Sequence, residues 1–309
     1  MTATYLHPTV NGVGLQLAAP RYFLGVDGGG TGTRVRLTDA QGFLLGQGEA
    51  GPSALGQGVE QAWQHIQQAV LAAARQAGLA SVEPAQAAIG LGLSGVSVKA
   101  QAQAFLAQQP GYLALALDGD GYTSLLGAHG GQPGAVVAVG TGSVGEALQR
   151  DGSRVCSSGW GWICGDEGSG AWLGLQAMRQ AQQALDGRGA VGALARAVWA
   201  VAGADRPSLL AFCAGAGQQG FAALAPLVFS HAELDPAAEA LLVMAVQALE
   251  QLANSLDPAG NLPLSLSGSI ALRLAPRLSS RLLARRTEPQ GDSAAGALLL
   301  IRQAAPGLL

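Results

Sequence analysis

The chain has 309 residues, a length that predicts about two domains, and 49% of its residues are hydrophobic while only 12% are charged. This composition supplies ample material for buried cores and excludes intrinsic disorder as the main state. The formal charge of −3 comes from 17 basic and 20 acidic residues without a long basic run, so we expect no nucleic-acid partner.

Targeting and redox signals are also absent from the sequence. Residues 1–17 lack the pattern of a secretion signal, and polar residues and glycines interrupt the uncharged stretches, so we expect a cytoplasmic protein without a membrane span. Cys156, Cys164 and Cys213 are odd in number and lack CxxC spacing, which argues against disulfides or structural zinc. We expect these thiols to be small buried residues.

The first half of the chain predicts three strands and then helices that alternate with strands, the order of an α/β unit. Residues 1–20 show no clear period and predict a loose leader. Glycine-rich turns separate the first strands, as in an antiparallel meander, and apolar residues at three- and four-residue steps predict the first helix. The predicted strands are 22–27, 34–38, 44–49, 88–93 and 112–117, and the predicted helices are 59–77 and 98–108.

The second half begins in the same way, which indicates a weak internal duplication. Strands are predicted at 135–139 and 144–149, on either side of the turn GTGS at 140–143. The later segments are mostly helical, and Asp235 is expected to cap one of these helices. The predicted helices are 169–185, 192–201, 236–255 and 292–304, and one more strand is predicted at 262–266.

Two glycine- and threonine-rich turns, each after a predicted strand, are candidate phosphate-binding segments. In DGGGTGT, Gly28, Gly29, Gly30 and Gly32 would let backbone N–H groups approach an anion, Thr31 and Thr33 would add hydroxyl donors, and Asp27 could hold a metal. The string alone also fits an ordinary hairpin. The second turn, Gly140, Thr141, Gly142 and Ser143, strengthens the phosphate interpretation, because two such turns can clamp a polyphosphate from both sides.

The nucleotide would have to be held without a P-loop lysine. Lys99 is the only lysine, and it does not follow the GxxxxG pattern. We therefore expect turns without cationic side chains and a site that depends on a metal ion.

Two acids, Asp118 and Asp120, stand between these turns at the end of a predicted strand. A carboxylate there can accept the proton of an attacking hydroxyl, whereas the alternative role of such acids is to cap a helix or form a turn, which we expect for one of the two. We predict that Asp120 is the base and that Asp118 is structural.

The segment at 158–170 combines glycines, tryptophans and paired acids, which suits a carbohydrate pocket. The alternative is a loop whose tryptophans belong to the core and whose Asp166 and Glu167 cap the next helix.

Several motifs occur together in one order: DGGGTGTR, LGLSG at 91–95, DGYTSLLGA at 120–128, GTGS, GWGWICGDEGSGAWLG at 159–174 and SGSIA at 267–271. From residue 22 to about 300 the sequence resembles N-acetylglucosamine kinases, in the bacterial branch related to the activator ATPases of benzoyl-CoA reductase. The resemblance implies the fold of the sugar kinase, heat-shock ATPase and actin superfamily. This fold has two related actin-like, ribonuclease H-like α/β domains with ATP in a central cleft.

The resemblance also implies roles for residues. Asp27 would lie near Mg²⁺, Thr31 and the second turn would hold ATP, and Asp120 would be the catalytic base. Gly268 and Ser269 match the adenosine side. The sugar would be lined by Ser94, Asp120, Ser143, Gly159, Trp160, Gly161 and Asp166. The implied domains are 22–130 and 131–291 after a leader at 1–21, and the helix 292–309 is expected to return to the first domain.

Two departures from the family concern the sugar. Relatives carry asparagines where Ala54 and Val144 stand here, so recognition of an acetamido group is in doubt. We predict a kinase for the 6-hydroxyl of N-acetylglucosamine, with glucosamine as the alternative, with ATP and Mg²⁺ as cofactors, and as a homodimer.

Three rival functions are less compatible with the sequence. A sugar-sensing transcription factor would need a DNA-binding module that the short leader cannot supply. An activator ATPase would need cysteines spaced for an iron–sulfur cluster. A structural filament would not need the pocket chemistry of the GWG…GDEGS segment.

Overall fold

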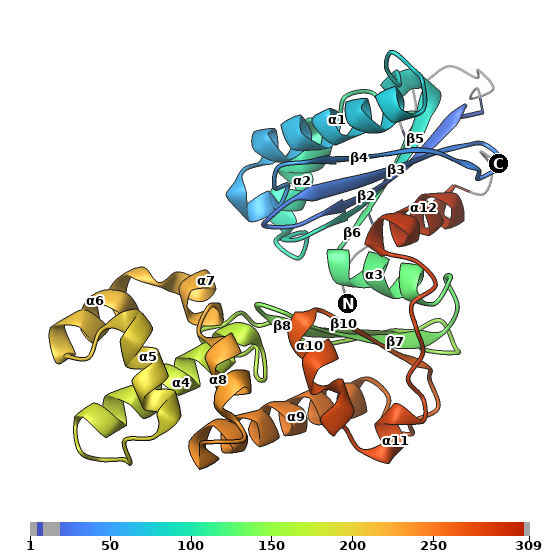
Figure 1. Ribbon diagram of the computed structural model, residues 1–309. Coiled ribbons are helices and arrows are strands. Elements are labelled where there is room, and N and C mark those ends of the chain that lie inside the picture. The colour runs from blue at the N-terminus through green and yellow to red at the C-terminus, as the bar shows by residue number, and fades with distance from the viewer. Residues whose placement is uncertain (1–4, 9–18, 306–309) are drawn as a thin grey trace. The chain divides into compact units, whose positions relative to one another are not determined.

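The computed structural model describes residues 5–8 and 19–305, which divide into two compact units, and each unit is built on its own sheet (Figure 1). Unit 1 holds the described residues up to Gly134, Arg150–Ser153 and the residues from Glu288 onward. Unit 2 holds Ala135–Gln149 and Arg154–Thr287. No described helix combines the length and apolar character that a membrane crossing requires.

Unit 1 contains a six-stranded sheet in the order β1-β6-β5-β2-β3-β4. Strands β2, β5 and β6 are mutually parallel, whereas β3 and β4 continue from β2 as the predicted antiparallel meander. The strands are β1 Tyr5–Pro8, β2 Tyr22–Gly28, β3 Thr33–Asp39, β4 Leu44–Ala50, β5 Ala87–Leu93 and β6 Ala114–Asp118.

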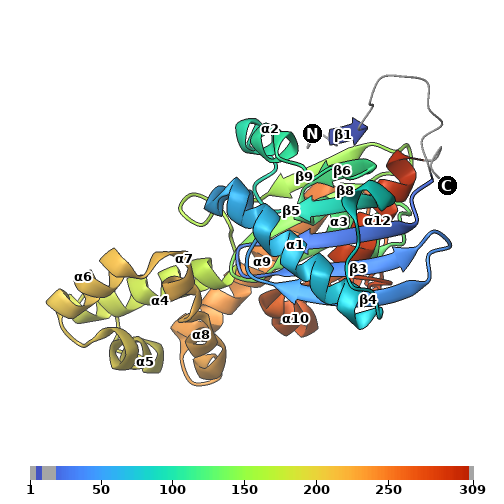
Figure 2. The same cartoon turned by 90° about the horizontal axis from the view of Figure 1, so that it is seen from above.

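The prediction of a loose leader is wrong at residues 5–8. Strand β1 forms the edge of the sheet and pairs antiparallel with β6, from Tyr5 opposite Leu117 to Pro8 opposite Ala114 (Figure 2). A strand of four residues is too short to produce a readable period, so only its pairing partner reveals it.

Helices cover both faces of the unit 1 sheet. Helix α1 (Val59–Gln76) packs against β3 and β4, and α12 (Ser293–Ala304) packs against β2, β5 and α3 (Asp120–Ala128) (Figure 1). The short helix α2 (Lys99–Ala107) follows β5. Close approach of α12 requires glycine on the strands, since a Cβ at Gly90 would collide with the carbonyl oxygen of Ala297.

Unit 2 contains a four-stranded sheet in the order β10-β7-β8-β9, in which β10 and β7 are parallel. The strands are β7 Gly134–Val139, β8 Ser143–Leu148, β9 Arg154–Ser158 and β10 Leu264–Ser267. The helices are α4 Gly170–Leu185, α5 Ala193–Ala202, α6 Arg206–Gly215, α7 Gly217–Ala222, α8 Ala225–His231, α9 Pro236–Leu256, α10 Ser269–Leu274 and α11 Ser280–Leu283.

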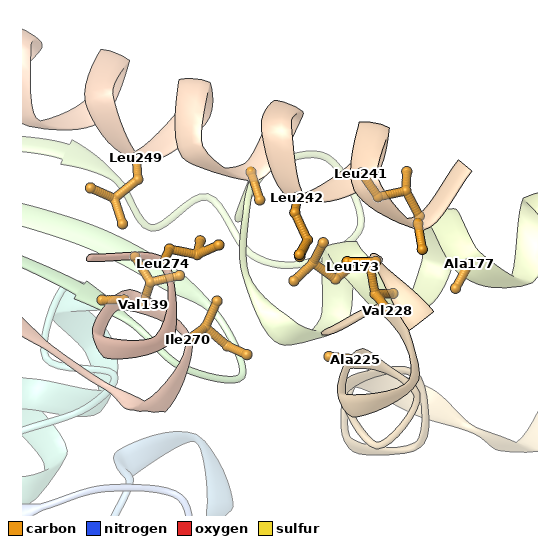
Figure 3. Packing of buried hydrophobic residues seen from close by; sticks show 14 of the residues in the cluster. Val139, Leu173, Ala177, Ala225, Val228, Leu241, Leu242, Leu249, Ile270 and Leu274 are labelled. Carbon is orange, nitrogen blue, oxygen red and sulfur yellow. The ribbon is translucent and has the colours of Figure 1, made fainter. Parts of the chain in front are cut away.

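Helix α9 supplies much of the unit 2 core. Figure 3 shows its Leu242 and Leu249 directed toward Leu173 of α4 and Leu274 of α10. The predicted cap is confirmed, because the Asp235 carboxylate accepts a hydrogen bond from the N–H of Ala237 at 2.9 Å. Helix α4 is capped by Ser169, which accepts from Trp172 N–H at 3.2 Å, rather than by either acid of the preceding segment.

The prediction of buried thiols is wrong for two of the three cysteines. Cys156 and Cys164 are exposed and Cys213 is partly buried, and all three are free. Cys156 lies on β9, at the edge of its sheet, and Cys164 lies in a glycine-rich loop.

Candidate active site

Three unit 1 segments meet at the carboxyl ends of parallel strands. Gly28 at the end of β2 lies opposite Leu93 of β5, and Gly92 lies opposite Asp118 of β6. The register therefore brings the first glycine turn, Ser94 and Asp120 to one edge of the sheet. The main chain ties two of these segments together, because Ser94 N–H donates to Gly28 O at 2.9 Å. This edge is where open α/β sheets bind their ligands.

The first glycine turn leaves space that no protein atom fills. A Cβ built on Gly29 would meet nothing within 4 Å, and one on Gly30 or Gly32 would have its nearest contact at 3.5 or 3.6 Å. None of these three glycines adopts positive φ. Packing and backbone conformation thus do not demand glycine here, whereas an anion approaching the N–H groups would.

The two threonines of this turn differ in environment. The Thr33 hydroxyl is buried and donates to Gly51 O at 2.6 Å and to Ser53 Oγ at 2.7 Å, so it ties the start of β3 to the segment that follows β4. The Thr31 side chain is exposed. Of the two hydroxyl donors that the sequence suggested, the structure leaves the one on Thr31 open to a ligand.

A cation stands beside the first turn, contrary to the prediction that the turns carry none. Arg34 lies directly opposite Asp27 in the β2–β3 ladder, and its Nη2 contacts Asp27 Oδ2 at 2.6 Å. Arg34 Nε contacts the same oxygen at 3.2 Å, and no described residue bonds to Oδ1. The sequence analysis considered only lysine and the turn residues themselves, and it overlooked the cross-strand neighbour.

The residues present fit a magnesium ion held by few protein ligands. No group of three or more His, Cys, Asp or Glu residues gathers among the described residues. Mg²⁺ in kinases is usually bound through one or two carboxylates and the substrate phosphates, with waters completing the octahedron. Asp27 offers Oδ1 for such a site, while its Oδ2 is held by Arg34.

The two acids after β6 have different surroundings. Asp118 is fully buried, and its Oδ1 accepts the N–H of Gly119 at 2.8 Å. Asp120, at the first turn of α3, is partly exposed and accepts the N–H of Gly121 at 3.0 Å. Burial, and next the negative charge of Asp27, raise the pKa of Asp120 above its ordinary value. A carboxyl with a raised pKa is a better proton acceptor when it is ionised.

This shift predicts how activity depends on pH. Because the base predicted at Asp120 must be ionised to accept a proton, kcat/KM should fall as the pH drops through the raised pKa of Asp120. The acid limb should have its midpoint above about 3.9, the value of an unperturbed aspartate. A pH profile of kcat/KM measures this midpoint in the free enzyme. A midpoint at or below that of an ordinary aspartate would contradict the assignment.

The second glycine turn occupies the corresponding edge in unit 2. Since β10 and β7 are parallel, with Ser267 opposite Ala138, the turn at 140–143 and the segment Gly268–Ser269 follow neighbouring strand ends. Gly268 has φ +88°, and a Cβ there would collide with Val139 O, so glycine is required. A Cβ on Gly140 would meet nothing within 4 Å, as at Gly29.

Two motifs that are distant in sequence are joined at this turn. The first two amides of α4 donate to it, Gly170 N–H to Gly140 O at 2.8 Å and Ala171 N–H to Thr141 O at 3.1 Å. Ser143 Oγ bonds to Glu167 O at 3.3 Å. The GTGS turn and the GDEGS segment therefore form one structural unit.

Asp166 is buried in this unit. Burial raises its pKa, although the backbone N–H groups of Ser143 and Gly161 bond to its carboxylate and oppose that effect. Ser158 and Asp166, which bracket the loop, are the only described non-glycine residues with positive φ, at +63° and +56°. Such backbone strain concentrates at functional sites.

A pocket of about 410 Å³ adjoins this unit. Ser143 and Trp160, both predicted to contact sugar, line it. Ser158 and Glu167, which belong to the segment predicted to suit a carbohydrate, line it as well. The remaining walls were missed by the sequence analysis: Ser157, Ala248, Gln251, Leu252 and Ser255. The spacing of Gln251 and Ser255 places them on one face of α9. In the structure Ser255 Oγ donates to Ser157 Oγ at 2.8 Å. Nothing in the sequence indicates that this face of α9 lies against residues 157–158.

The loop at 159–165 shows why one tryptophan is available and the other is not. The Trp160 side chain is 85% exposed and borders the pocket. Trp162 is partly buried against Phe221 of α7, with ring centroids 5.7 Å apart. The core interpretation thus holds for Trp162 and is wrong for Trp160. Gly159 and Gly161 both have positive φ, at +76° and +89°.

Comparisons with known proteins agree on the kind of protein. A profile of the BadF/BadG/BcrA/BcrD ATPase family matches residues 24–300. Glucosamine kinase GspK of Vibrio cholerae is 33% identical over 90% of this chain and 95% of its own length. N-acetyl-D-glucosamine kinase of Dictyostelium discoideum is 28% identical over 80% of this chain and 84% of its own length.

A solved structure is also similar over nearly the whole described chain. It is a Chromobacterium violaceum protein provisionally assigned as an N-acetylglucosamine kinase, and it is 49% identical. The match covers 91% of this chain and 99% of that chain, with a TM-score of 0.87.

Proposed function

Because the chain belongs to the BadF/BadG/BcrA/BcrD ATPase family, we propose that it is an ATP-dependent kinase that phosphorylates the 6-hydroxyl of an amino sugar. The observation that carries the proposal is the pocket in unit 2. Ser143, Ser158, Glu167 and the exposed Trp160 are among the residues that line it, and Ser143 also belongs to the second glycine turn. A polyhydroxylated acceptor bound there would lie beside a phosphate-binding segment.

In this proposal the two glycine turns bind the phosphates of one ATP through main-chain N–H groups. Thr31 adds a hydroxyl donor, and Gly268 and Ser269 border the adenosine. The ion pair of Arg34 and Asp27 lies beside the first glycine turn. Mg²⁺, held by Asp27, would neutralise charge on the phosphates. The cooperation of both turns on one nucleotide is the central element of the proposal.

Asp120 acts on the acceptor. Its carboxylate would orient the sugar 6-hydroxyl and accept its proton as that oxygen bonds to the γ-phosphorus and the bond from the γ-phosphorus to ADP breaks. The product pair is a sugar 6-phosphate and ADP. Exclusion of water from the assembled site would suppress loss of the phosphoryl group to solvent.

Two acceptors are supported by different observations. N-acetylglucosamine is the substrate in the name of the Dictyostelium relative and in the provisional assignment of the Chromobacterium structure. Glucosamine is the substrate in the name of the Vibrio relative. Ala54 and Val144 lack the side-chain amide that could hydrogen-bond an acetamido group, which favours the free amine.

The proposed activity is tested by ADP release. Purified protein with Mg²⁺ and ATP is assayed against N-acetylglucosamine, glucosamine, N-acetylmannosamine and glucose, with a reaction lacking sugar. We expect release that depends on one of the first two sugars. Equal release without sugar would contradict a kinase and favour an ATPase.

Replacement of Trp160 tests the pocket. Because its ring is exposed, W160A should leave the thermal midpoint unchanged while raising the sugar KM by roughly 2- to 10-fold, equivalent to about 0.5–1.5 kcal/mol of lost ring contact. Ile163, which is 77% exposed in the same loop but does not line the pocket, provides the matched control I163A. Equal KM values for both variants would remove Trp160 from the acceptor site.

A further inference from the structure

Helix α7 contacts residues 159–166, here called the acceptor loop, at two points. At one, Phe221 is buried and packs against Trp162 of the loop. At the other, Gln218 Nε2 lies 3.4 Å from Asp166 Oδ2. The helix itself is fixed against α4, because Gly174 lets the two backbones approach so closely that a Cβ there would collide with Phe221 O. Gln218 thus presents its amide from a well-anchored element.

The carboxylate that Gln218 contacts also contacts the second glycine turn. A Cβ built on Gly142 would lie 2.6 Å from Asp166 Oδ2 and 3.4 Å from Gln218 Nε2. The Asp166 carboxylate therefore leaves no room for a side chain at position 142, whereas a Cβ at position 140 would meet no protein atom. The N–H groups of Ser143 in the turn and of Gly161 in the loop bond to the same carboxylate.

Main-chain bonds reinforce this connection. Gly159 N–H donates to Ser143 O at 3.0 Å, and Ser169 N–H donates to Asp166 O at 3.0 Å. A shift of the loop that rotates Asp166 would therefore move donors and acceptors of the phosphate-binding turn. Contiguous bonds of this kind can carry energetic coupling between two ligands.

We propose that Gln218 is a positioning residue that holds Asp166. Asp166 in turn couples the acceptor loop to the second glycine turn, so that bound sugar and bound nucleotide each tighten the binding of the other. The inference rests on the proposed function, since it places sugar at the loop and phosphate at the turn. Coupling of this kind is reciprocal: the factor by which sugar tightens ADP equals the factor by which ADP tightens sugar.

Calorimetry with Mg²⁺ and ADP, with and without saturating amino sugar, measures the factor. For the wild type we expect sugar to tighten ADP by about 5-fold or more, the lower end of typical couplings. Gln218→Ala should bring the factor close to 1 while the thermal midpoint stays within the range of the wild type. Gln218→Met, which keeps the side-chain length without the amide, should behave in the same way and guards against a cavity effect.

Gln219→Ala is the matched control, because Gln219 is the exposed neighbour on α7 with no described side-chain partner. It should retain the wild-type factor. Wild-type coupling in both Gln218 variants would overturn the inference, and so would a wild-type factor of 1. In either case sugar-dependent ADP release by the wild type would leave the proposed kinase activity standing, whereas sugar-independent release would overturn that activity separately.

Discussion

Replacement of Asp120 by asparagine should lower kcat by about 10²- to 10⁴-fold, the usual contribution of a general base. The amide keeps the size of the carboxyl and can still accept the N–H of Gly121, so the helix start should persist. ADP affinity should stay near the wild-type value, because the proposed role of Asp120 is to act on the acceptor rather than on the nucleotide. Steady-state kinetics and ADP titration together check both parts.

Stability should change in the opposite direction from activity. Since the pKa of Asp120 is raised in the folded protein, protonation of this group stabilises the fold at low pH, and that contribution is lost as the pH rises through the raised value. At neutral pH the ionised group is a cost that asparagine removes. The thermal midpoint of D120N at pH 7 should therefore equal or exceed that of the wild type.

Replacement of the neighbouring Asp118 distinguishes a catalytic base from a structural carboxylate. Asp118 is buried and bonds to the N–H of Gly119, so D118N should act mainly on the thermal midpoint. Near-normal turnover in D120N would remove Asp120 from the reaction. A loss of turnover confined to D118N would transfer the role of base to Asp118.

Alanine at Gly29 or Gly140 should weaken ADP binding by about 10- to 150-fold without lowering the thermal midpoint. Each added Cβ has open space within the protein, so folding should tolerate it. The methyl group would occupy the volume that a phosphate needs. The phosphate would then lose charge-assisted hydrogen bonds from the main chain that contribute about 1.5–3 kcal/mol to binding. Calorimetry with ADP and thermal unfolding measure the two effects.

Gly215, the last residue of α6, provides a control within unit 2, because a Cβ there also meets nothing within 4 Å. G215A should change neither ADP affinity nor the thermal midpoint beyond a small gain in helix propensity. Unchanged ADP affinity in both G29A and G140A would contradict phosphate binding at the turns. A loss in only one of them would restrict the nucleotide to that turn.

The elements that the sequence predicted are those with a strong period or clear boundaries. Helix α1 and strands β2 to β5 lie within a residue of their predicted ends, because apolar spacing and glycine turns mark them. Short elements without a period, such as β1 and α7, were not predicted, since pairing and packing with distant residues determine them.

The candidate site likewise contains residues that local sequence patterns indicate and residues that only the structure reveals. Glycine turns and acids at strand ends are local patterns, so Gly29, Gly140 and Asp120 could be proposed as site residues from the sequence. Arg34 beside Asp27 and Gln218 beside Asp166 follow from cross-strand pairing and from helix packing, neither of which a sequence motif encodes. The exposure of Trp160 and the engagement of Thr33 likewise required the structure.

A crystal structure with Mg²⁺, a non-hydrolysable ATP analogue and the accepted amino sugar tests the central claim most directly. The account predicts that phosphate oxygens accept hydrogen bonds from main-chain N–H groups of both the Gly29–Thr31 and the Gly140–Gly142 segments. It also predicts the sugar 6-hydroxyl within about 2.6–3.2 Å of the Asp120 carboxylate. Phosphates bound by one segment alone, with the 6-hydroxyl remote from Asp120, would contradict it.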